Sequence, residues 1–218
     1  MSKSLGNVVN PMDILGLYGP DALRYYLLRE VIFGLDGTFT TESFETRFNG
    51  DLANDLGNLV SRSLTMLEKY FEGVVPKPGP SGELESQMAS VAGAYAPAAR
   101  QAMGKLEFHT TLMRAWDLVK RANKYIDETA PYKIAKEGEA GREKLATVMF
   151  TLVEALRVTA LAIAPFMPFT AQAIWAQLGY SDEIQGHSLA ETGEWGKIPV
   201  GQKIAKGAGL FPRIEKKK

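Results

Sequence analysis

The sequence TESFETRFNGDLANDLGNLVSRSLTMLEKYFE, residues 41–72, gives the clearest indication of how this chain folds. Apolar or small residues recur along it every three or four positions, which places them in one stripe along a helix. The members of this stripe are Phe44, Phe48, Leu52, Leu56, Leu59, Ser63 and Met66. Thr41, followed by Glu42 and Glu45, suits the start of such a helix. The stretch therefore predicts one long amphipathic helix over residues 41–72.

Helical spacing continues on both sides of this stretch. The further helices that it predicts are residues 12–18, 21–31, 83–104, 107–128, 143–164 and 166–178. Pro97 predicts a kink or a break in one of them, and the proline- and glycine-rich residues 76–82 predict a linker. The glycine-rich tail is poor in strand pattern and is expected to wrap over the helices. The sequence thus predicts an all-α bundle of five or six helices with a loop-rich lead-in and tail.

Composition excludes several classes of function. The 25 basic and 25 acidic residues balance, which disfavours nucleic-acid binding through a general cationic field but permits a local site that reads bases. Because the chain has no cysteine and two histidines, His109 and His187, we expect no disulfide, no thiolate chemistry and no metal site. The longest apolar run, residues 158–167, is too short to cross a bilayer, and no segment resembles a signal peptide. We therefore expect a cytoplasmic protein with no membrane partner.

At the front of the chain, two hydroxyl side chains flank one lysine in Ser2-Lys3-Ser4. The surrounding residues are rich in glycine, serine and asparagine and indicate a loop ahead of a helix. A mobile cation in that setting can stabilise charge that builds up on a phosphate group during its transfer. A tripeptide this short also occurs by chance, so its meaning depends on the residues around it.

Those residues resemble a known family. Residues 1–7, MSKSLGN, resemble the Lys-Met-Ser-Lys-Ser signature of class I aminoacyl-tRNA synthetases without its first lysine. Residues 18–24, YGPDALR, match the Asp-Ala-Leu-Arg helix of those enzymes at the usual interval. Residues 44–62, 127–131 and 210–214 resemble the methionyl branch in particular. The resemblance covers nearly the whole chain and implies a helical bundle of the class I synthetase anticodon-binding type.

The resemblance implies the C-terminal part of a methionine–tRNA ligase, in which Lys3, with Ser2 and Ser4, acts on ATP and Mg²⁺ serves as cofactor. The His-x-Gly-His motif and the nucleotide-binding α/β unit of these enzymes do not occur in the sequence. We therefore expect residues 1–37 to be a stub of the catalytic region and residues 38–218 to be the anticodon-binding domain with its wrapping tail. The expected partners are tRNA(Met) and a missing N-terminal catalytic domain. The chain alone should bind tRNA, hold no cofactor and be inactive.

Asn54, Asn58 and Arg62 are spaced four residues apart and share one helix face. An amide and a guanidinium on a rigid helix suit the hydrogen-bonding edges of bases, although the same spacing also describes a solvated polar stripe. In the family the matching asparagine and arginine contact anticodon bases, chiefly the cytosine at the first position. The resemblance implies that role for Asn58 and Arg62.

The third member of the family's site is an aromatic residue after an Ala-Pro pair, commonly tryptophan. Here it is Tyr132, whose ring can stack on a base or lie half-buried at a helix end.

A second function stays open at this point: a non-catalytic helical protein-interaction module derived from a synthetase. Such a role does not need Asn58, Arg62 and Tyr132. The tail also has two interpretations, because its basic residues suit either a solvated tail or a strap that contacts phosphate. These residues are Lys197, Lys203, Lys206, Arg213, Lys216, Lys217 and Lys218.

Overall fold

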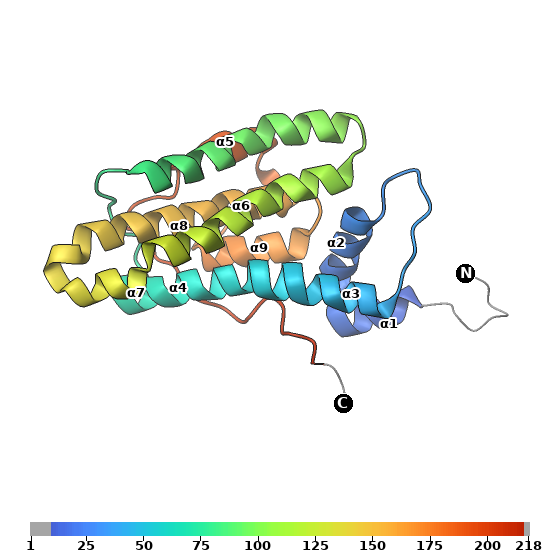
Figure 1. The fold of residues 1–218 in the computed structure, drawn as a ribbon, viewed down its shortest axis with the longest axis horizontal. Coiled ribbons are helices and arrows are strands. Elements are labelled where there is room, and N and C mark those ends of the chain that lie inside the picture. The colour runs from blue at the N-terminus through green and yellow to red at the C-terminus, as the bar shows by residue number, and fades with distance from the viewer. Residues whose placement is uncertain (1–9, 216–218) are drawn as a thin grey trace.

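The computed structural model of the chain describes residues 10–215, and the regular elements within that range are helices (Figure 1). The α-helices are α1 (Pro11–Tyr18), α2 (Pro20–Glu30), α3 (Thr41–Arg47), α4 (Asn58–Phe71), α5 (Glu83–Gly104), α6 (Phe108–Thr129), α7 (Pro131–Ile134), α8 (Arg142–Ile163) and α9 (Pro168–Gln177). A π-helix, η2 (Phe48–Gly57), joins α3 to α4. The 3₁₀-helices are η3 (Ala135–Gly141), η4 (Ile184–Gly186) and η5 (Leu189–Gly193). The predicted all-α bundle is confirmed, while Ser2, Lys3 and Ser4 lie outside the described residues.

The long helix predicted over residues 41–72 is present as α3, η2 and α4, which follow one another without a loop. The predicted stripe is buried along its length except at its last member, Met66, which is half-buried. Leu67, the next residue, is buried instead. The apolar face therefore lies as predicted, but the helix has a wider turn in its middle than the sequence pattern revealed.

Helix α5 continues through Pro97, so of the two predictions for this position the break is wrong, while the kink stays a prediction. Proline removes one hydrogen bond to the carbonyl four residues earlier, here that of Gly93. Pro97 lies on the exposed side of the helix and Gly93 is half-buried, so water can reach the carbonyl that loses its partner. The helix tolerates the proline because the missing bond faces solvent.

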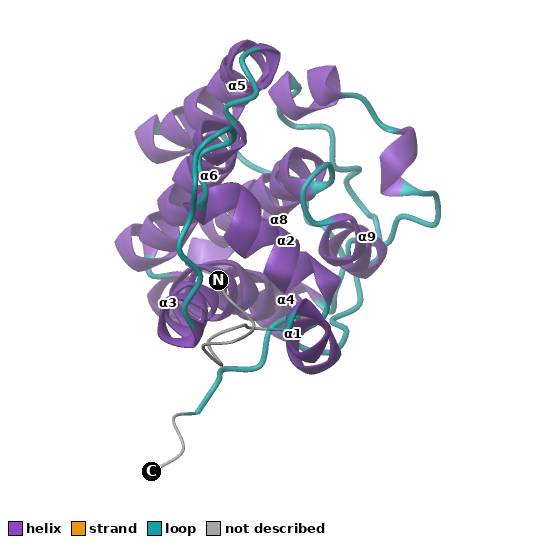
Figure 2. Cartoon of the chain, turned by 90° about the vertical axis from the view of Figure 1, so that its right-hand side faces the viewer, coloured by secondary structure: helices purple, strands orange, loops and turns teal. Residues whose placement is uncertain are grey.

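Helix α8 is the centre of the bundle, as the end-on view shows (Figure 2). From Leu145 to Ile163 all but one of its residues are buried. The helical stretch Phe108–Ile163 contains a window that is long and apolar enough to cross a membrane, and 94% of that window is buried inside the protein. Burial of this kind is what the core helix of a bundle requires, because both its faces pack against other helices.

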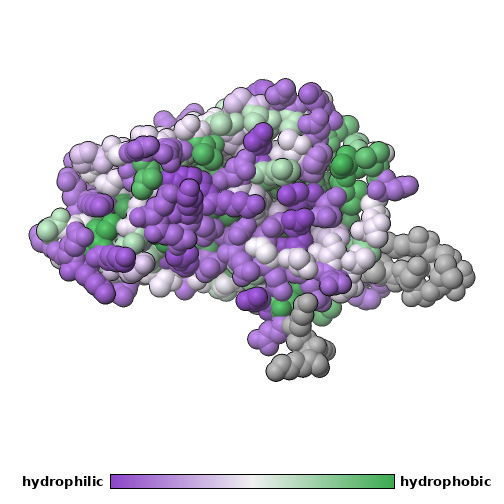
Figure 3. All heavy atoms as spheres, viewed as in Figure 1, coloured by the Kyte–Doolittle hydropathy of each residue, from purple (hydrophilic) through white to green (hydrophobic). Residues whose placement is uncertain are grey.

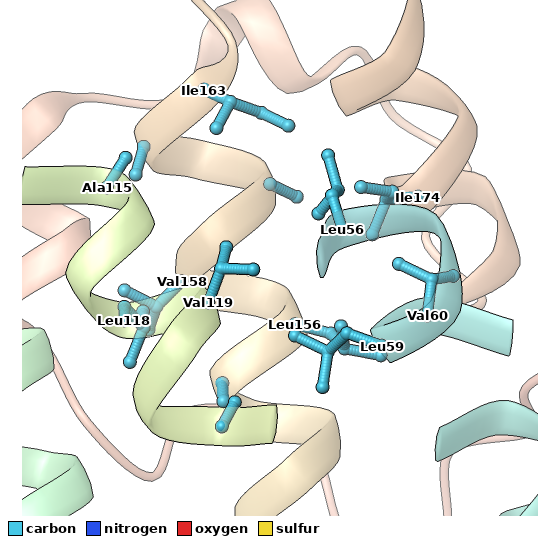
Figure 4. Close-up of a cluster of buried hydrophobic side chains, with 14 of the residues drawn as sticks. Leu56, Leu59, Val60, Ala115, Leu118, Val119, Leu156, Val158, Ile163 and Ile174 are labelled. Carbon is cyan, nitrogen blue, oxygen red and sulfur yellow. The ribbon is translucent and has the colours of Figure 1, made fainter. Parts of the chain in front are cut away.

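Apolar side chains from four elements meet beside α8 (Figure 4). They include Leu56 from η2, Leu59 from α4, Val119 from α6 and Ile174 from α9, all fully buried. Each such side chain stabilises the fold by about 1.5–3 kcal/mol relative to its exposed state. This shared core fixes the position of α4 relative to α6, which matters for the polar side chains on their outer faces.

Residues 194–215 form an extended segment that crosses the bundle, and we call it the C-terminal strap (Figure 1). The backbone N–H of Ile204 donates to the Gly73 carbonyl at 2.7 Å, and Val75 donates to the Gln202 carbonyl at 3.0 Å. At its end, Ile214 exchanges two hydrogen bonds with the Asn49 side-chain amide, at 2.8 and 3.0 Å. The tail therefore wraps over the bundle as predicted.

Candidate nucleic-acid interface

The wide turn of η2 comes directly before the predicted base-reading residues. Phe48, Leu52 and Leu56 are spaced by four, and on an ordinary α-helix each such step drifts by about 40° around the axis. All three are buried in the core of the bundle. Helices with this hydrogen bonding are rare and often occur at functional sites. Steps of four residues also fit the apolar stripe of an ordinary α-helix, so this spacing does not reveal the π-helix.

Asn54 on η2 and Asn58 at the start of α4 are exposed. Neither amide makes a side-chain hydrogen bond within residues 10–215, although most buried or structural amides would. Each amide therefore presents a donor and an acceptor to solvent. These are the groups that an asparagine needs to read the edge of a base.

Arg62, one turn beyond Asn58, is half-buried and contacts helix α6. Its Nη2 lies 3.3 Å from Oδ1 of Asp127, and the side chains of the two residues are 38% and 72% exposed. An ion pair this exposed contributes about 0–1 kcal/mol to stability. It orients one edge of the guanidinium and leaves its other N–H groups free for a ligand.

A second polar contact joins η2 to α6. The Asn123 side chain donates to the carbonyl of Asp55 at 3.0 Å and to that of Val119 at 3.2 Å. Burial raises the pKa of the Asp55 carboxyl above its ordinary value, with a further upward contribution from Asp51 and a downward one from Lys120. The backbone between Asn54 and Asn58 is thus held against α6, which makes the stripe rigid.

Tyr132 lies on α7, directly after the corner that ends α6. Ala130 takes a left-handed conformation with φ of 45°, and the buried Pro131 starts α7. The Tyr132 ring is 52% exposed, and its hydroxyl makes no hydrogen bond within residues 10–215. Asp127 is five residues away, so the two Cα atoms lie within about 18 Å of each other. Because Asp127 contacts Arg62, the ring and the guanidinium belong to the same end of the bundle.

The structure adds residues that sequence reasoning did not assign. Asp127 was part of a recognised segment, but nothing in the sequence paired it with Arg62 across 65 residues. Asn123 likewise contacts the backbone of a distant helix, and its spacing resembles that of any helix surface. Packing of α4 against α6 creates both contacts.

An exposed amide, an oriented guanidinium and an exposed aromatic ring lie at one end of the helical bundle, and groups of these kinds suit the edges and faces of bases, which makes this end the candidate nucleic-acid interface. Residues 87–201 match the family model described as the anticodon-binding domain of tRNA ligase, and residues 1–64 match the model described as tRNA synthetases class I (M).

Relatives of known name agree with these matches. The chain is 46% identical over 218 residues to a methionine–tRNA ligase of Caldanaerobacter subterraneus subsp. tengcongensis, covering 100% of this chain and 34% of the relative. It is 47% identical over 221 residues to a methionine–tRNA ligase of Bacillus subtilis, covering 99% of this chain and 32% of the relative. A solved structure of Mycobacterium tuberculosis methionyl-tRNA synthetase in complex with methionyl-adenylate superposes with a TM-score of 0.90 at 36% identity, covering 98% of this chain and 41% of that one.

The chain therefore belongs to the methionyl-tRNA synthetase family of class I and contains its anticodon-binding domain. It spans about a third of the length of the curated relatives that it matches. The resemblance drawn from the signature residues is confirmed, while the division of the chain at residue 37 stays a prediction.

Proposed function

We propose that the chain is the tRNA-reading part of a methionine–tRNA ligase that works in the cytoplasm. In this role it holds tRNA(Met) by its anticodon while the rest of the enzyme attaches methionine at the expense of ATP. The observation that carries the proposal is the stripe of Asn54, Asn58 and Arg62, whose polar groups are exposed or only half-buried on a rigid helix. Tyr132 adds a ring for stacking at the adjoining corner.

The test is binding of tRNA(Met) against tRNAs altered only at the first anticodon base, at one fixed salt concentration. Arg62→Ala should cost about 1–3 kcal/mol and relax discrimination at that base, the range for one good base-specific contact. Arg114→Ala is a matched control, because Arg114 is also a helical surface arginine paired with an aspartate, Asp117, at 3.2 Å. If Arg62→Ala lowers the affinity for every anticodon by the same factor, Arg62 contacts phosphate and does not read a base.

The catalytic role of the front loop is part of the same proposal. Lys3, with Ser2 and Ser4, would act on the phosphates of ATP in the full-length enzyme, with Mg²⁺ as the accompanying ion. Lys3→Ala in that enzyme should slow methionine activation by about two or more orders of magnitude, the scale of losing one oriented charge-stabilising group. Binding of tRNA should be retained, and an activation rate within a few-fold of normal would contradict the assignment.

An exposed apolar patch suits contact with the rest of the enzyme. Figure 3 shows apolar side chains gathered at the end of the bundle where the α2–α3 connection and the α5–α6 turn lie. Ile32, Phe33, Leu35 and Leu106 are between 49% and 64% exposed there. Patches of this kind usually mark an interface. Since the relatives are about three times as long as this chain, we assign the patch to the N-terminal catalytic domain.

The same patch is what the alternative function, a protein-interaction module, would use. The two proposals differ in the selectivity of tRNA binding that they predict. The assembly module predicts equally weak binding to every tRNA, because it has no use for base-reading groups. The anticodon-binding proposal predicts that tRNA(Met) is preferred.

A further inference from the structure

Lys206, in the C-terminal strap, is held at both ends of its side chain on helix α4. Its backbone N–H donates to Oε1 of Glu68 at 3.0 Å, and its Nζ donates to Oγ1 of Thr65 at 2.8 Å. Fixing a lysine in this way restricts a side chain that otherwise has much rotamer freedom. A tail that is only solvated would not fix an ammonium group on the hydroxyl of one particular helix, so the strap is held on α4.

The position of Thr65 puts this ammonium group in line with the candidate reading residues. Asn58, Arg62, Thr65 and Lys69 follow one another by four, three and four residues, which places them on one side of α4. Thr65 lies three residues beyond Arg62, or about 4.5 Å further along the helix axis. The strap therefore adds a cation to the stripe at the step directly after the arginine.

The charges on this part of the stripe are not neutralised in pairs. Within residues 10–215, no carboxylate lies within 4.0 Å of the ammonium group of either Lys206 or Lys69. Glu68 is the nearest acid on the helix, and one of its oxygens is engaged by the backbone of Lys206. Lys69 is exposed and lies 5.5 Å from the centre of the Tyr70 ring. Two cations without an ion-pair partner thus follow Arg62 along the surface.

We propose that Lys206 and Lys69 bind the phosphate backbone of the RNA whose bases Asn58 and Arg62 read. The inference rests on the proposed function and adds the strap to the RNA-binding surface. A compact ammonium group suits a phosphate oxygen as a point charge, and such contacts set the register of the RNA without reading its sequence. Because the chain has no net charge, local cations of this kind must supply the phosphate contacts.

The experiment measures the affinity of the chain for a tRNA(Met) transcript over a series of salt concentrations. Lys206→Gln removes the charge and keeps a group that can bond Thr65. It should reduce the slope of log affinity against log salt by about one. Over a fourfold rise in salt, the variant should therefore lose about fourfold less affinity than the unaltered chain. Lys69→Gln should do the same, the double variant should lose about two units of slope, and Lys206→Arg should leave the slope unchanged.

Lys197→Gln is the matched control on the same strap. Lys197 is also exposed, but its ammonium group lies 3.6 Å from the Glu194 carboxylate and far along the strap from α4. Its slope should equal that of the unaltered chain. An equal fall in Lys197→Gln and Lys206→Gln would show a general cationic effect and would overturn the inference. So would an unchanged slope in Lys206→Gln.

The anticodon series separates this inference from the proposed function. Lys206→Gln should weaken binding of tRNA(Met) and of the anticodon-altered tRNAs by the same factor. If the unaltered chain discriminates among anticodons while Lys206→Gln keeps its slope, the phosphate site is wrong and the reading function stands. If the unaltered chain does not discriminate while the slope falls as expected, the phosphate site stands and the reading function is wrong.

Discussion

The protein contains two arginine–carboxylate pairs that use the same groups in opposite ways. Arg157 and Glu154, both on α8, are 4% and 0% exposed and form two hydrogen bonds with each other, at 2.7 and 2.9 Å. Glu154 also accepts three backbone N–H groups of the strap, from Gly196, Lys197 and Ile198, and Arg157 donates to the Glu194 carbonyl. Arg62 and Asp127 make one bond of 3.3 Å on the surface.

The difference lies in how many polar atoms are left free. A buried charged group needs hydrogen-bond partners, because each buried donor or acceptor without a partner has lost its water and gains nothing in the protein interior to offset that desolvation penalty. The α8 pair meets most of this demand within the protein, through the Nε and Nη2 groups of Arg157, both carboxylate oxygens of Glu154 and the strap backbone. The α4–α6 pair is unsaturated and hydrated, so an incoming base or phosphate replaces water at little cost. The two pairs thus differ in burial and in how many of their polar groups are bonded within the protein, and the surface pair is the one whose groups can still meet a ligand.

The largest expected effect is on the buried pair. Glu154→Gln keeps the shape of the side chain but turns an amide toward backbone N–H groups and leaves Arg157 without its counter-charge. Breaking one partner of a buried pair costs about 3–5 kcal/mol. Denaturant unfolding followed by helical circular dichroism should show this loss as a lower midpoint with an unchanged slope.

A result below about 1 kcal/mol for Glu154→Gln would remove the basis of the comparison, because the buried pair would then behave like a surface pair. The unaltered chain should itself unfold in one cooperative step, since its helices share one core. A gradual loss of helical signal would show that the bundle needs further parts of the enzyme.

Sequence spacing was sufficient for the helices, because long amphipathic segments carry their own apolar stripe. It failed where the backbone departed from the ordinary α-helix. The four-residue steps of Phe48, Leu52 and Leu56 fit a helix well enough to hide the wider turn of η2. At Pro97 the sequence predicted a break that is absent. The cost of a proline in a helix depends on whether the carbonyl that loses its hydrogen bond faces water, and the sequence does not show this.

For the candidate site, the sequence supplied residues on single helices but none of the contacts between elements. Asn58 and Arg62 were predicted because they lie one turn apart on a helix that resembles the family. The contact of Arg62 with Asp127 and that of Lys206 with Thr65 join residues 65 and 141 positions apart. No periodicity encodes such distances, since they result from how the helices and the strap pack.

The second prediction concerns Tyr132, whose exposed ring lies on α7, directly after the helix that carries Asp127. Tyr132→Ala should weaken tRNA binding by about 1–3 kcal/mol, with less selectivity among bases than Arg62→Ala, because every base has a face that can stack. Tyr132→Trp should be tolerated or bind slightly more tightly, since it adds ring area. Loss of thermal stability in Tyr132→Ala without loss of binding would assign the ring to the fold and not to the RNA.

The third prediction concerns His187, which lies between the two extremes of burial. Its Nδ1 is 2.6 Å from Glu191 and its Nε2 is 2.7 Å from Asp182. These two hydrogen-bonded carboxylates, Glu191 first, raise the pKa of His187 above its ordinary value despite an opposing effect of burial. Because the pKa of His187 is higher in the folded than in the unfolded state, protonated His187 contributes to the free energy of unfolding. This contribution is fully present below the pKa of the unfolded state, about 6.5, and is lost as pH rises through the pKa of the folded state.

The measurement is the thermal midpoint as a function of pH, with His187→Gln as the control. In the unaltered chain the midpoint should fall as pH rises above about 6.5, and in His187→Gln this fall should disappear. At the acid end, the lowered pKa values of Asp182 and Glu191 predict a separate loss of stability that begins as pH falls below their ordinary values of about 4. A pH profile above 6.5 that is identical in both proteins would assign the dependence to another group.

The smallest expected effect belongs to the surface pair itself. Asp127→Asn removes one hydrated charge from a single bond of 3.3 Å, and the amide can still accept a bond from Arg62. Its cost to folding should lie within about 1 kcal/mol, which for a chain of this size shifts the thermal midpoint by about 2–4 °C at most.

Asp127→Asn should also change the affinity and the selectivity of RNA binding, because Arg62 loses the carboxylate that orients its guanidinium and RNA phosphates lose a repelling charge. We therefore expect affinity for every tRNA to be retained or raised and the preference for the first anticodon base to shrink, by less than in Arg62→Ala. A destabilisation of Asp127→Asn comparable to that of Glu154→Gln would show that the surface pair is structural, and Arg62 would then be held too firmly to act as a reading group.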